Sequence, residues 1–254
     1  MAVDDLFSLC DKTALVTGCA EGIGASIATA LARAGAQVIG FDIGSMQETA
    51  TKISSDGGTF NGYRVDLSDT EEISRTWNTA LAEQGGIDIL VNNAGYQYRA
   101  PAIDFPDEQF EKIFAVNMNA PYQLSQLAVK HFLATERRGK IINIASLFSS
   151  FGGINVSAYT CSKHAVMGLT RAFSNEYSPM GITVNAIAPG YVATKITRSI
   201  WSDSEKNAPI LSRIPIGRWA TGEDFAGISI FLASSASDYI TGVMIPVDGG
   251  YSVR

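Results

Sequence analysis

The stretch T-A-L-V-T-G-C-A-E-G-I-G, residues 13–24, decides the fold of this chain. Its first five residues form an apolar run that is typical of a buried β-strand, and a helical pattern over residues 22–34 follows directly. Glycines at such a junction let the backbone approach a pyrophosphate, which then lies at the amino terminus of the helix. The spacing G-x-x-x-G-x-G differs from the commoner G-x-G-x-x-G, so an ordinary tight turn is the alternative interpretation.

The same alternation of short apolar runs and helical patterns continues along the chain. It predicts strands at residues 13–17, 37–41, 60–65, 89–92, 140–144, 183–187 and 243–247. It predicts helices at residues 22–34, 46–55, 70–84, 107–131, 158–177 and 222–233, with Pro121 kinking or interrupting the fourth. Strictly alternating strands and helices indicate an α/β fold with a parallel sheet and helices on both faces. No linker or repeat divides the chain, so residues 1–254 are predicted to form a single doubly wound domain.

Composition and charge exclude several classes of function. The chain has 254 residues, 46% of them hydrophobic, which is enough for a large core. Its formal net charge of −6 argues against nucleic acids and anionic membranes as partners. The three cysteines, Cys10, Cys19 and Cys161, show no C-x-x-C spacing, so neither a disulfide framework nor a metal site is expected. No apolar run approaches the length of a membrane span and the first residues are acidic, so we expect a cytoplasmic protein.

A carboxylate ends the second predicted strand. Asp42 lies roughly 20 residues beyond Gly24, where a carboxylate can accept hydrogen bonds from the adenosine ribose hydroxyls and repels a 2′-phosphate. Glu21 adds a negative charge to the glycine-rich turn, and residues 18–24 contain no lysine or arginine. The sequence therefore favours NAD(H) over NADP(H), with an ordinary strand-end turn residue as the alternative interpretation of Asp42.

Tyr159 and Lys163 are four residues apart in the predicted helix 158–177, so both lie on one helix face. A free tyrosine titrates near ~10, which is too high for proton transfer at neutral pH. A positive charge at about 4 Å, in an effective dielectric of about 20, contributes roughly 4 kcal/mol and lowers the pKa of the phenol by about 3 units, to near 7. Ser146, just after strand 140–144, then holds the substrate oxygen. By itself, Y-x-x-x-K is more often a buried aromatic beside a solvated lysine.

Together these motifs resemble the short-chain dehydrogenase/reductase family over essentially the whole chain. The motifs are T-G-x-x-x-G-I-G at 17–24, N-N-A-G at 92–95, Asn117 in V-N-M-N, Ser146, Y-x-x-x-K at 159–163 and P-G at 189–190. The resemblance implies a Rossmann-type, seven-stranded parallel sheet with strand order 3-2-1-4-5-6-7 and a nicotinamide cofactor. It also implies a catalytic set of Asn117, Ser146, Tyr159 and Lys163.

The resemblance assigns a role to each of these positions. The tyrosine is the general acid/base and the serine orients the reacting oxygen. The lysine binds the nicotinamide ribose and lowers the pKa of the tyrosine, and the asparagine holds a relay water through its main chain. The predicted cofactor contacts are Gly18, Glu21, Gly22, Ile23, Gly24, Asp42, Asp66, Leu67, Asn93, Gly95, Tyr159, Lys163, Pro189, Val192 and Thr194. Among these, Asp66 and Leu67 are expected by the adenine, Asn93 by the adenosine ribose, and Val192 and Thr194 by the carboxamide.

The substrate side of the site is predicted from the segment that follows the P-G turn. Residues 191–213 combine aromatic and charged side chains with weak periodicity, so we expect a mobile lid over the substrate. Arg99 suits a bidentate contact to a carboxylate, although a solvated loop arginine is equally consistent. The resemblance implies a homotetramer, in which Arg254 reaches a neighbouring subunit's site as a second candidate. The predicted substrate contacts are Arg99, Ser146, Tyr159, Tyr191 and Arg254.

Three further stretches resemble the sugar-acid dehydrogenase branch of the family. They are G-K-I-I-N-I-A-S at 139–146, R-I-P-I-G-R-W at 213–219 and F-L-A-S-S-A-S-D-Y at 231–239. The expected activity is the NAD-dependent oxidation of a secondary alcohol on a small sugar acid of the 2-keto-3-deoxy aldonate type. The alternatives are a 3-oxoacyl-thioester reductase or a neutral sugar or polyol dehydrogenase of the same fold. A non-catalytic dinucleotide-binding protein is the alternative from another class.

Overall fold

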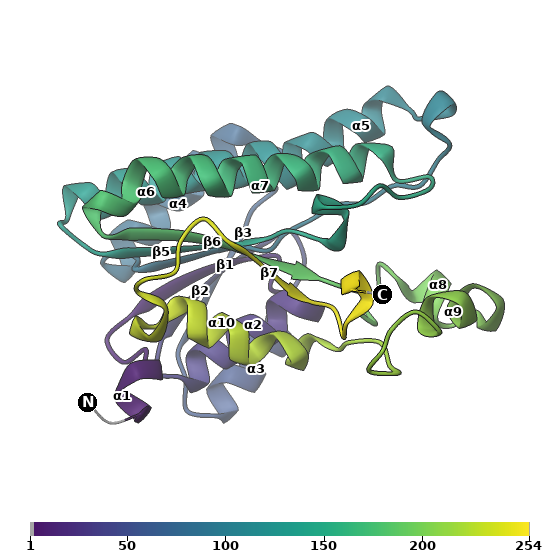
Figure 1. The fold of residues 1–254 in the computed structure, drawn as a ribbon. Coiled ribbons are helices and arrows are strands. Elements are labelled where there is room, and N and C mark those ends of the chain that lie inside the picture. Colours follow the sequence, from purple (N-terminus) through teal and green to yellow (C-terminus); the bar gives the residue numbers. More distant parts are fainter. Residues whose placement is uncertain (1–2, 254) are drawn as a thin grey trace.

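Seven parallel strands form one sheet in the computed structural model, which describes residues 3–253 (Figure 1). The strands are β1 (Thr13–Thr17), β2 (Gln37–Asp42), β3 (Phe60–Arg64), β4 (Ile89–Asn92), β5 (Gly139–Ile144), β6 (Ile182–Pro189) and β7 (Met244–Val247). Their order is β3-β2-β1-β4-β5-β6-β7 and every pairing is parallel, which confirms the predicted topology. Every residue of β4 and β6 is buried, because helices cover both faces, and this burial accounts for their mainly apolar sequences.

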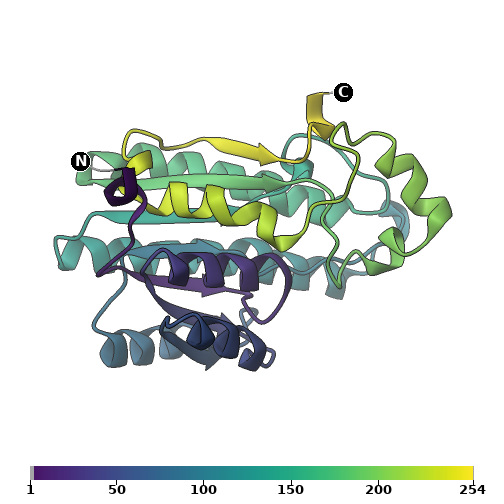
Figure 2. The ribbon, with the colours of Figure 1, turned by 90° about the horizontal axis from the view of Figure 1, so that it is seen from below.

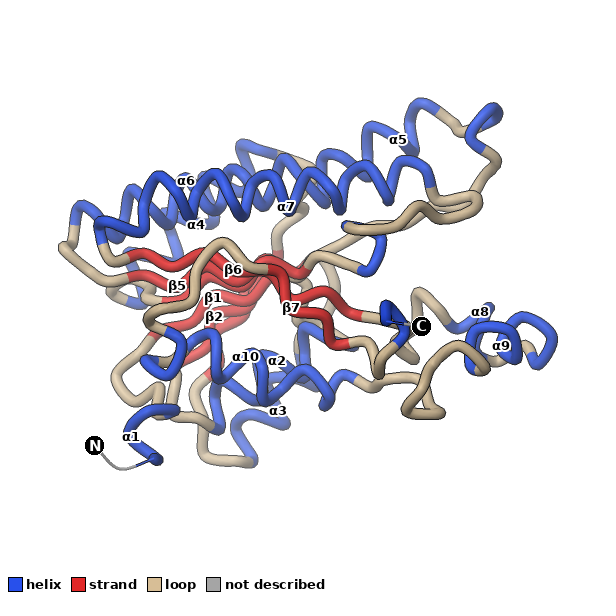
Figure 3. The backbone as a smooth tube through the Cα atoms, viewed as in Figure 1, coloured by secondary structure: helices blue, strands red, loops and turns tan. Residues whose placement is uncertain are grey.

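The helices form two layers, one on each face of the sheet (Figures 1 and 3). One layer consists of α2 (Gly22–Arg33), α3 (Gln47–Ser55) and α10 (Ala226–Ala233), and the other of α4 (Thr70–Gln84), α5 (Asp107–Phe114), α6 (Ala120–Ala134) and α7 (Ser157–Tyr177). Each layer encloses its own core. In β1, Val16 packs into the core under α2 and its neighbour Leu15 into the core under α6, since successive strand residues point to opposite faces.

The helical stretch predicted at residues 107–131 has three parts. Between α5 and α6, residues Ala115–Asn119 form a single π-helical turn, η2. Pro121 lies in the first turn of α6, directly after this π-helical turn, and has no N–H to donate to it. The interruption expected at Pro121 is therefore a π-helical turn that directly precedes it.

The segment 191–213 leaves the sheet after β6 and protrudes at one end of the molecule (Figure 2). It contains two short helices, α8 (Arg198–Trp201) and α9 (Ser204–Leu211). Neither has a buried residue, which explains why its sequence shows only weak periodicity. A final turn, η7 (Tyr251–Val253), follows β7. Arg254, the second predicted carboxylate ligand, lies outside the described residues.

The short helices α8 and α9 were not predicted from the sequence, and neither was a helix before the first strand. The helix α1 (Val3–Phe7) precedes β1 and has no buried residue, so it carries no periodic apolar signal. Across residues 3–253, no helix combines the length and the apolar character that crossing a lipid bilayer requires.

Candidate functional site

The turn between β1 and α2 is shaped by its glycines. Gly18 has a φ of +66° and Gly22 a φ of +63°, values that favour glycine over residues with a side chain. A Cβ atom at Gly24 would collide with the carbonyl oxygen of Gly18 and with the side-chain amide of Asn93. The chain therefore comes closer to itself here than any side chain would allow, while Ile23 packs against the core below.

Asn93, at the end of β4, holds this turn in place. Its Nδ2 donates to the carbonyl oxygens of Thr17 and Gly18, each at 2.9 Å. In return, Thr17 Oγ1 accepts from the backbone N–H groups of Asn93 and Ala94, each at 3.0 Å. The side-chain amide predicted to lie by the adenosine ribose is thus engaged with the glycine turn. Gly95, two residues on, is less tightly enclosed, because an added Cβ would lie 3.7 Å from Asn117 Oδ1, at ordinary contact distance.

The amino end of α2 offers backbone donors to an anion. Glu21 is the N-cap residue of α2 but makes no capping hydrogen bond. Its carboxylate lies 3.6 Å from the ammonium of Lys195, at the start of the segment 191–213. Thr194 faces the turn as well, with its Cγ2 atom 3.5 Å from where a Cβ on Gly22 would be. The first N–H groups of α2 have no side-chain acceptor, which suits them to bind a pyrophosphate.

Asp42, at the carboxyl end of β2, faces the glycine turn. One carboxylate oxygen accepts from the N–H of Ala20 at 2.9 Å and the other from the N–H of Gly44 at 2.8 Å. A carboxylate has about four acceptor positions, so two remain for a bound ribose. In the sheet register, Arg64 of β3 is the partner of Asp42. The positive charge of Arg64 also helps to lower the pKa of Asp66.

Asp66 and Leu67 follow β3 at the same edge of the sheet. Asp66 Oδ1 accepts from the N–H of Ser68 at 2.9 Å and from its hydroxyl at 2.7 Å, and these hydrogen bonds lower the pKa of Asp66. The side chain of Leu67 is buried in the core beneath α4 and α6. Only the backbone of Leu67 is therefore available to an adenine.

Ser146, Tyr159 and Lys163 meet where β5 ends and α7 begins. Ser146 Oγ accepts from the N–H of Phe148 at 3.2 Å and is also hydrogen-bonded to the phenol of Tyr159. The ammonium nitrogen of Lys163 lies 5.7 Å from the centre of the Tyr159 ring. It donates to the carbonyl oxygen of Ile144 at 2.7 Å. Both helix residues thus face the end of β5, as their spacing predicts.

The electrostatics of this group differ from the sequence-based expectation. Burial raises the pKa of Tyr159 above its ordinary value of 10, and the Ser146 hydrogen bond and the positive charge of Arg99 offset only part of that rise. Burial also lowers the pKa of Lys163 to about 8. The expected phenol pKa near 7 is therefore wrong for this structure, because the cost of burying a phenolate exceeds the favourable interactions.

The π-helical turn η2 carries Asn117 into the interior. Asn117 Oδ1 accepts from the N–H of Tyr96 at 2.7 Å. Its Nδ2 donates to the carbonyl oxygen of Tyr96 at 2.9 Å and to Ser162 Oγ at 3.1 Å. The side chain is fully used in joining η2 to the loop after β4 and to α7. Only the main chain of Asn117 is available for chemistry.

A hollow of about 170 Å³ opens beside Tyr159 and Ser146. Arg99 and Tyr191, both predicted substrate contacts, lie in its wall. So do Arg213 and Tyr251, which were not predicted. Arg213 ends the segment 191–213, and its guanidinium carbon lies 4.3 Å from the centre of the Tyr251 ring. The hollow thus combines a proton-transfer group with two cationic side chains.

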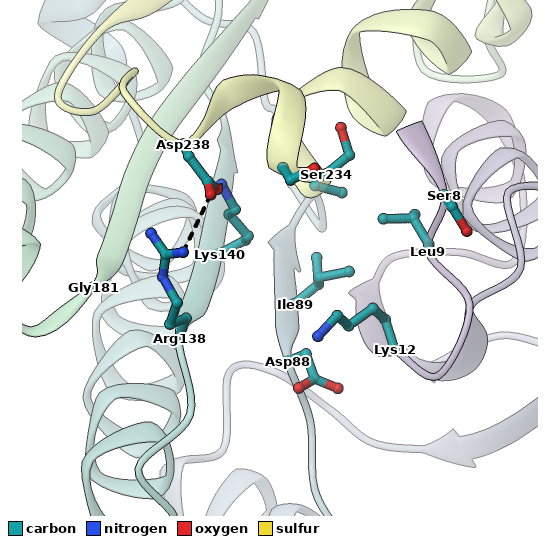
Figure 4. A pocket seen from close by; sticks show the side chains of 12 residues that line it. Ser8, Leu9, Lys12, Asp88, Ile89, Arg138, Lys140, Gly181, Ser234 and Asp238 are labelled. Atoms are coloured by element: carbon teal, nitrogen blue, oxygen red, sulfur yellow. Dashed lines mark hydrogen bonds and ion pairs between the residues drawn. The ribbon is translucent and has the colours of Figure 1, made fainter. Parts of the chain in front are cut away.

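A larger hollow, of about 230 Å³, lies at the opposite ends of the strands (Figure 4). There, the carboxylate of Asp238 forms ion pairs with the ammonium of Lys140 at 2.7 Å and with the guanidinium of Arg138 at 3.3 Å. These ion pairs tie the start of β5 to the segment after α10. Because sites in parallel sheets lie beyond the carboxyl ends of the strands, the hollow at Tyr159 is the candidate active site.

Comparison with known proteins agrees with this geometry. A family model described as enoyl-(acyl carrier protein) reductase matches residues 18–252. The chain belongs to the short-chain dehydrogenase/reductase family. Similar members are the 2-dehydro-3-deoxy-D-gluconate 5-dehydrogenases of Bacillus subtilis and Escherichia coli, which are 50% and 46% identical over 98% of both chains. A solved gluconate 5-dehydrogenase from Burkholderia cenocepacia, in complex with NADP and tartrate, has a TM-score of 0.94 and 33% identity over 100% of both chains.

This short-chain dehydrogenase/reductase is therefore an oxidoreductase that uses a nicotinamide cofactor, and its relatives are sugar-acid dehydrogenases. Pro189 ends β6 and lines the hollow, as does Tyr191 two residues later. Val192 is buried and pairs with Ala220 in an isolated bridge, which fixes where the segment 191–213 begins. Two residues that line the hollow, Arg213 and Tyr251, were not predicted to contact the substrate. For Arg213, the available signals were its place at the end of the predicted lid and at the start of the stretch R-I-P-I-G-R-W.

Proposed function

We propose that this enzyme oxidises a secondary alcohol of a 2-dehydro-3-deoxy sugar acid to a ketone, with NAD⁺ as the acceptor. The observation that carries the proposal is the meeting of Ser146, Tyr159 and Arg99 in one hollow at the carboxyl ends of the strands. The serine and tyrosine suit an alcohol or ketone oxygen, and the arginine suits a carboxylate. The names of the relatives support the same substrate class.

In the proposed mechanism, Tyr159 is the general acid/base. The hydroxyl of Ser146 orients the substrate oxygen, and Tyr159, once its phenol has lost its proton, takes the O–H proton while the substrate carbon loses its hydride. A nicotinamide cofactor bound beside Tyr159 and Lys163 would supply the acceptor for that hydride. An ammonium has three donors, and Lys163 uses one on Ile144, so two remain for the nicotinamide ribose. Asn117 is proposed to hold a relay water through its main chain, since its side chain is engaged.

The preference for NAD is part of the proposal and rests on Asp42. A 2′-phosphate beside this carboxylate would meet its negative charge and that of Glu21, whereas ribose hydroxyls can donate to the acceptor positions of Asp42 that remain. Arg64, the partner of Asp42 in the sheet register, favours NADP instead, because an arginine can bind a 2′-phosphate. The Burkholderia cenocepacia enzyme binds NADP. A higher kcat/KM with NADP⁺ than with NAD⁺ would overturn the NAD assignment. Under the proposal, Asp42→Asn lowers the ratio of kcat/KM with NAD⁺ to kcat/KM with NADP⁺.

A substrate panel tests the reaction class. We expect NAD⁺ reduction with 2-dehydro-3-deoxy-D-gluconate to exceed that with neutral polyols and with 3-hydroxyacyl thioesters. Faster turnover of polyols would favour the polyol dehydrogenase alternative, and faster turnover of thioesters would favour the acyl-thioester reductase. If NADH binds but no member of the panel reacts, the chain is a non-catalytic dinucleotide-binding protein.

We also propose that the enzyme is a cytoplasmic homotetramer. Aromatic side chains are exposed on the surface of α5 and α6, with Phe110 44% and Tyr122 43% accessible. Phe110 stacks on Phe114, with ring centres 4.6 Å apart, which extends this apolar surface. Burying such a surface against another subunit is favourable. Light scattering that gives the mass of a monomer at micromolar concentration would contradict the assembly.

A further inference from the structure

We propose that Arg213, positioned by the ring of Tyr251, is a second cation that binds the substrate carboxylate, opposite Arg99. Together the two arginines would set the preference for acids over neutral sugars. The inference deepens the proposed function and rests on it for the identity of the substrate. What it adds is an anion-binding site formed by two parts of the chain, the loop after β4 and the end of the segment 191–213.

The two guanidinium groups act on the same small space. Arg99 and Arg213 both line the hollow that contains Tyr159. The positive charges of both lower the pKa of Tyr191, although burial and a hydrogen bond with Tyr251 raise it overall, to about 12. Within residues 3–253, neither arginine takes part in an ion pair. Two cations without a carboxylate in one hollow of about 170 Å³ favour an anionic ligand between them.

Tyr251 fixes the position of Arg213. The guanidinium carbon lies 4.3 Å from the centre of the Tyr251 ring, a cation–π contact. A guanidinium that stacks on a ring keeps its N–H groups at the edge, free to donate to a carboxylate. Tyr251 is itself held on two sides: its ring centre lies 5.1 Å from that of Tyr191, and its N–H donates to the carbonyl oxygen of Asp248 at 3.2 Å.

Asp248 gives the turn that carries Tyr251 its shape. Its two carboxylate oxygens accept from the N–H groups of Gly250 and Ser252, each at 2.9 Å. The turn therefore does not depend on the Tyr251 side chain. Replacing that side chain removes the ring under Arg213 and leaves the backbone hydrogen bonds of η7 in place. Tyr251 is thus a positioning residue that can be tested separately from the fold of its turn.

Arg213→Gln tests the proposal directly. A charge-assisted hydrogen bond lost from the substrate carboxylate corresponds to a rise in KM for 2-dehydro-3-deoxy-D-gluconate of about 10- to 100-fold. We expect kcat to change less than KM, because the carboxylate is bound away from the reacting hydroxyl. The KM for a neutral polyol should not change. The matched control is Arg198→Gln, which removes a charge from the same segment at α8, outside the hollow.

Tyr251 variants test the positioning. Tyr251→Leu removes the ring and should raise the KM for the acid toward that of Arg213→Gln. Tyr251→Phe keeps the ring, and should restore most of the affinity that Tyr251→Leu loses. If Tyr251→Phe were as impaired as Tyr251→Leu, the ring would not be what holds Arg213, and the positioning role would be wrong.

Calorimetry with D-gluconate separates this proposal from the proposed function, because it requires no turnover. We expect wild-type protein to bind gluconate at least tenfold more tightly than Arg213→Gln, and the Arg198→Gln control to bind like wild type. Equal binding by wild type and Arg213→Gln would overturn the second-cation role. So would an equal rise in KM for acid and neutral substrates, since that result indicates a disturbed lid. Failure of wild type to oxidise any sugar acid would overturn the proposed function alone.

Discussion

The ammonium of Lys163 donates to the carbonyl oxygen of Ile144, at 2.7 Å, across the junction between α7 and the end of β5. Lys163 is 4% exposed, and this burial lowers its pKa to about 8. The lysine therefore fastens the helix that carries Tyr159 to the strand that leads into Ser146. The protonation state of Lys163 therefore affects the stability of the fold as well as the proposed chemistry.

Stability should depend on pH through Lys163. The pKa of Lys163 is about 8 in the folded protein, whereas the ordinary pKa of a lysine is 10.5. Between these two pH values the unfolded chain keeps a proton on this lysine that the folded protein has lost. Stability from this group therefore rises with pH across that window and is absent below pH 8. The full effect is about 3 kcal/mol. Urea unfolding of wild type and Lys163→Met at pH 7.5 and pH 10 gives the free energy of unfolding of each protein. If the difference in this free energy between the two proteins were the same at both pH values, the role of Lys163 in the pH dependence would be wrong.

Arg99 should affect the pH dependence of turnover. Its positive charge lowers the pKa of Tyr159, so Arg99→Gln raises that pKa further and moves the rising limb of the oxidation profile, along which the phenol loses its proton, to higher pH. Profiles of kcat/KM with a neutral polyol isolate this effect from carboxylate binding. Arg171→Gln, an exposed arginine on α7, is the control and should leave the limb in place. A limb that moves to lower pH in Arg99→Gln would refute the electrostatic role.

Tyr159→Phe should lose the reaction while it keeps the site. The ring of Tyr159 packs edge-on against Phe148, with ring centres 6.2 Å apart, and phenylalanine preserves that contact. Removing the hydroxyl removes the acid/base, so kcat should fall by at least about 100-fold. NADH binding, followed by fluorescence titration, should be nearly unchanged. A variant that retained more than a few per cent of the wild-type rate would show that another group moves the proton.

Replacing two glycines by alanine tests whether the turn between β1 and α2 binds the cofactor. Gly24→Ala places a methyl group against the carbonyl oxygen of Gly18 and the amide of Asn93, so the turn must open. We expect at least a tenfold loss of NADH affinity together with a lower melting temperature. Gly227→Ala, on α10, is the control, because a Cβ added there would have no neighbour within 4 Å. Equal NADH affinity in both variants would mean that the turn does not bind the pyrophosphate.

The strands could be predicted because burial on both faces leaves mainly apolar runs, as in β4 and β6. Their order was implied by the resemblance to the family. The positions of Ser146, Tyr159 and Lys163 followed from helix spacing and from the end of β5. The pKa of Tyr159 could not be predicted, because it depends on burial that no local pattern encodes. Nor could the pair of Arg213 and Tyr251, since their contact joins distant segments. Local sequence predicts elements and motifs, whereas desolvation and long-range pairing require the folded chain.

The π-helical turn at Ala115–Asn119 makes the number of residues between α5 and α6 a fixed quantity. In such a turn the N–H of Ala120 reaches back five residues, to the carbonyl oxygen of Ala115. Deleting one residue would produce an uninterrupted α-helix and rotate α5 by roughly 100° about its axis. Ile113, now buried, would then swing toward solvent. Length variation among homologues should therefore avoid this turn and collect in the loops on either side.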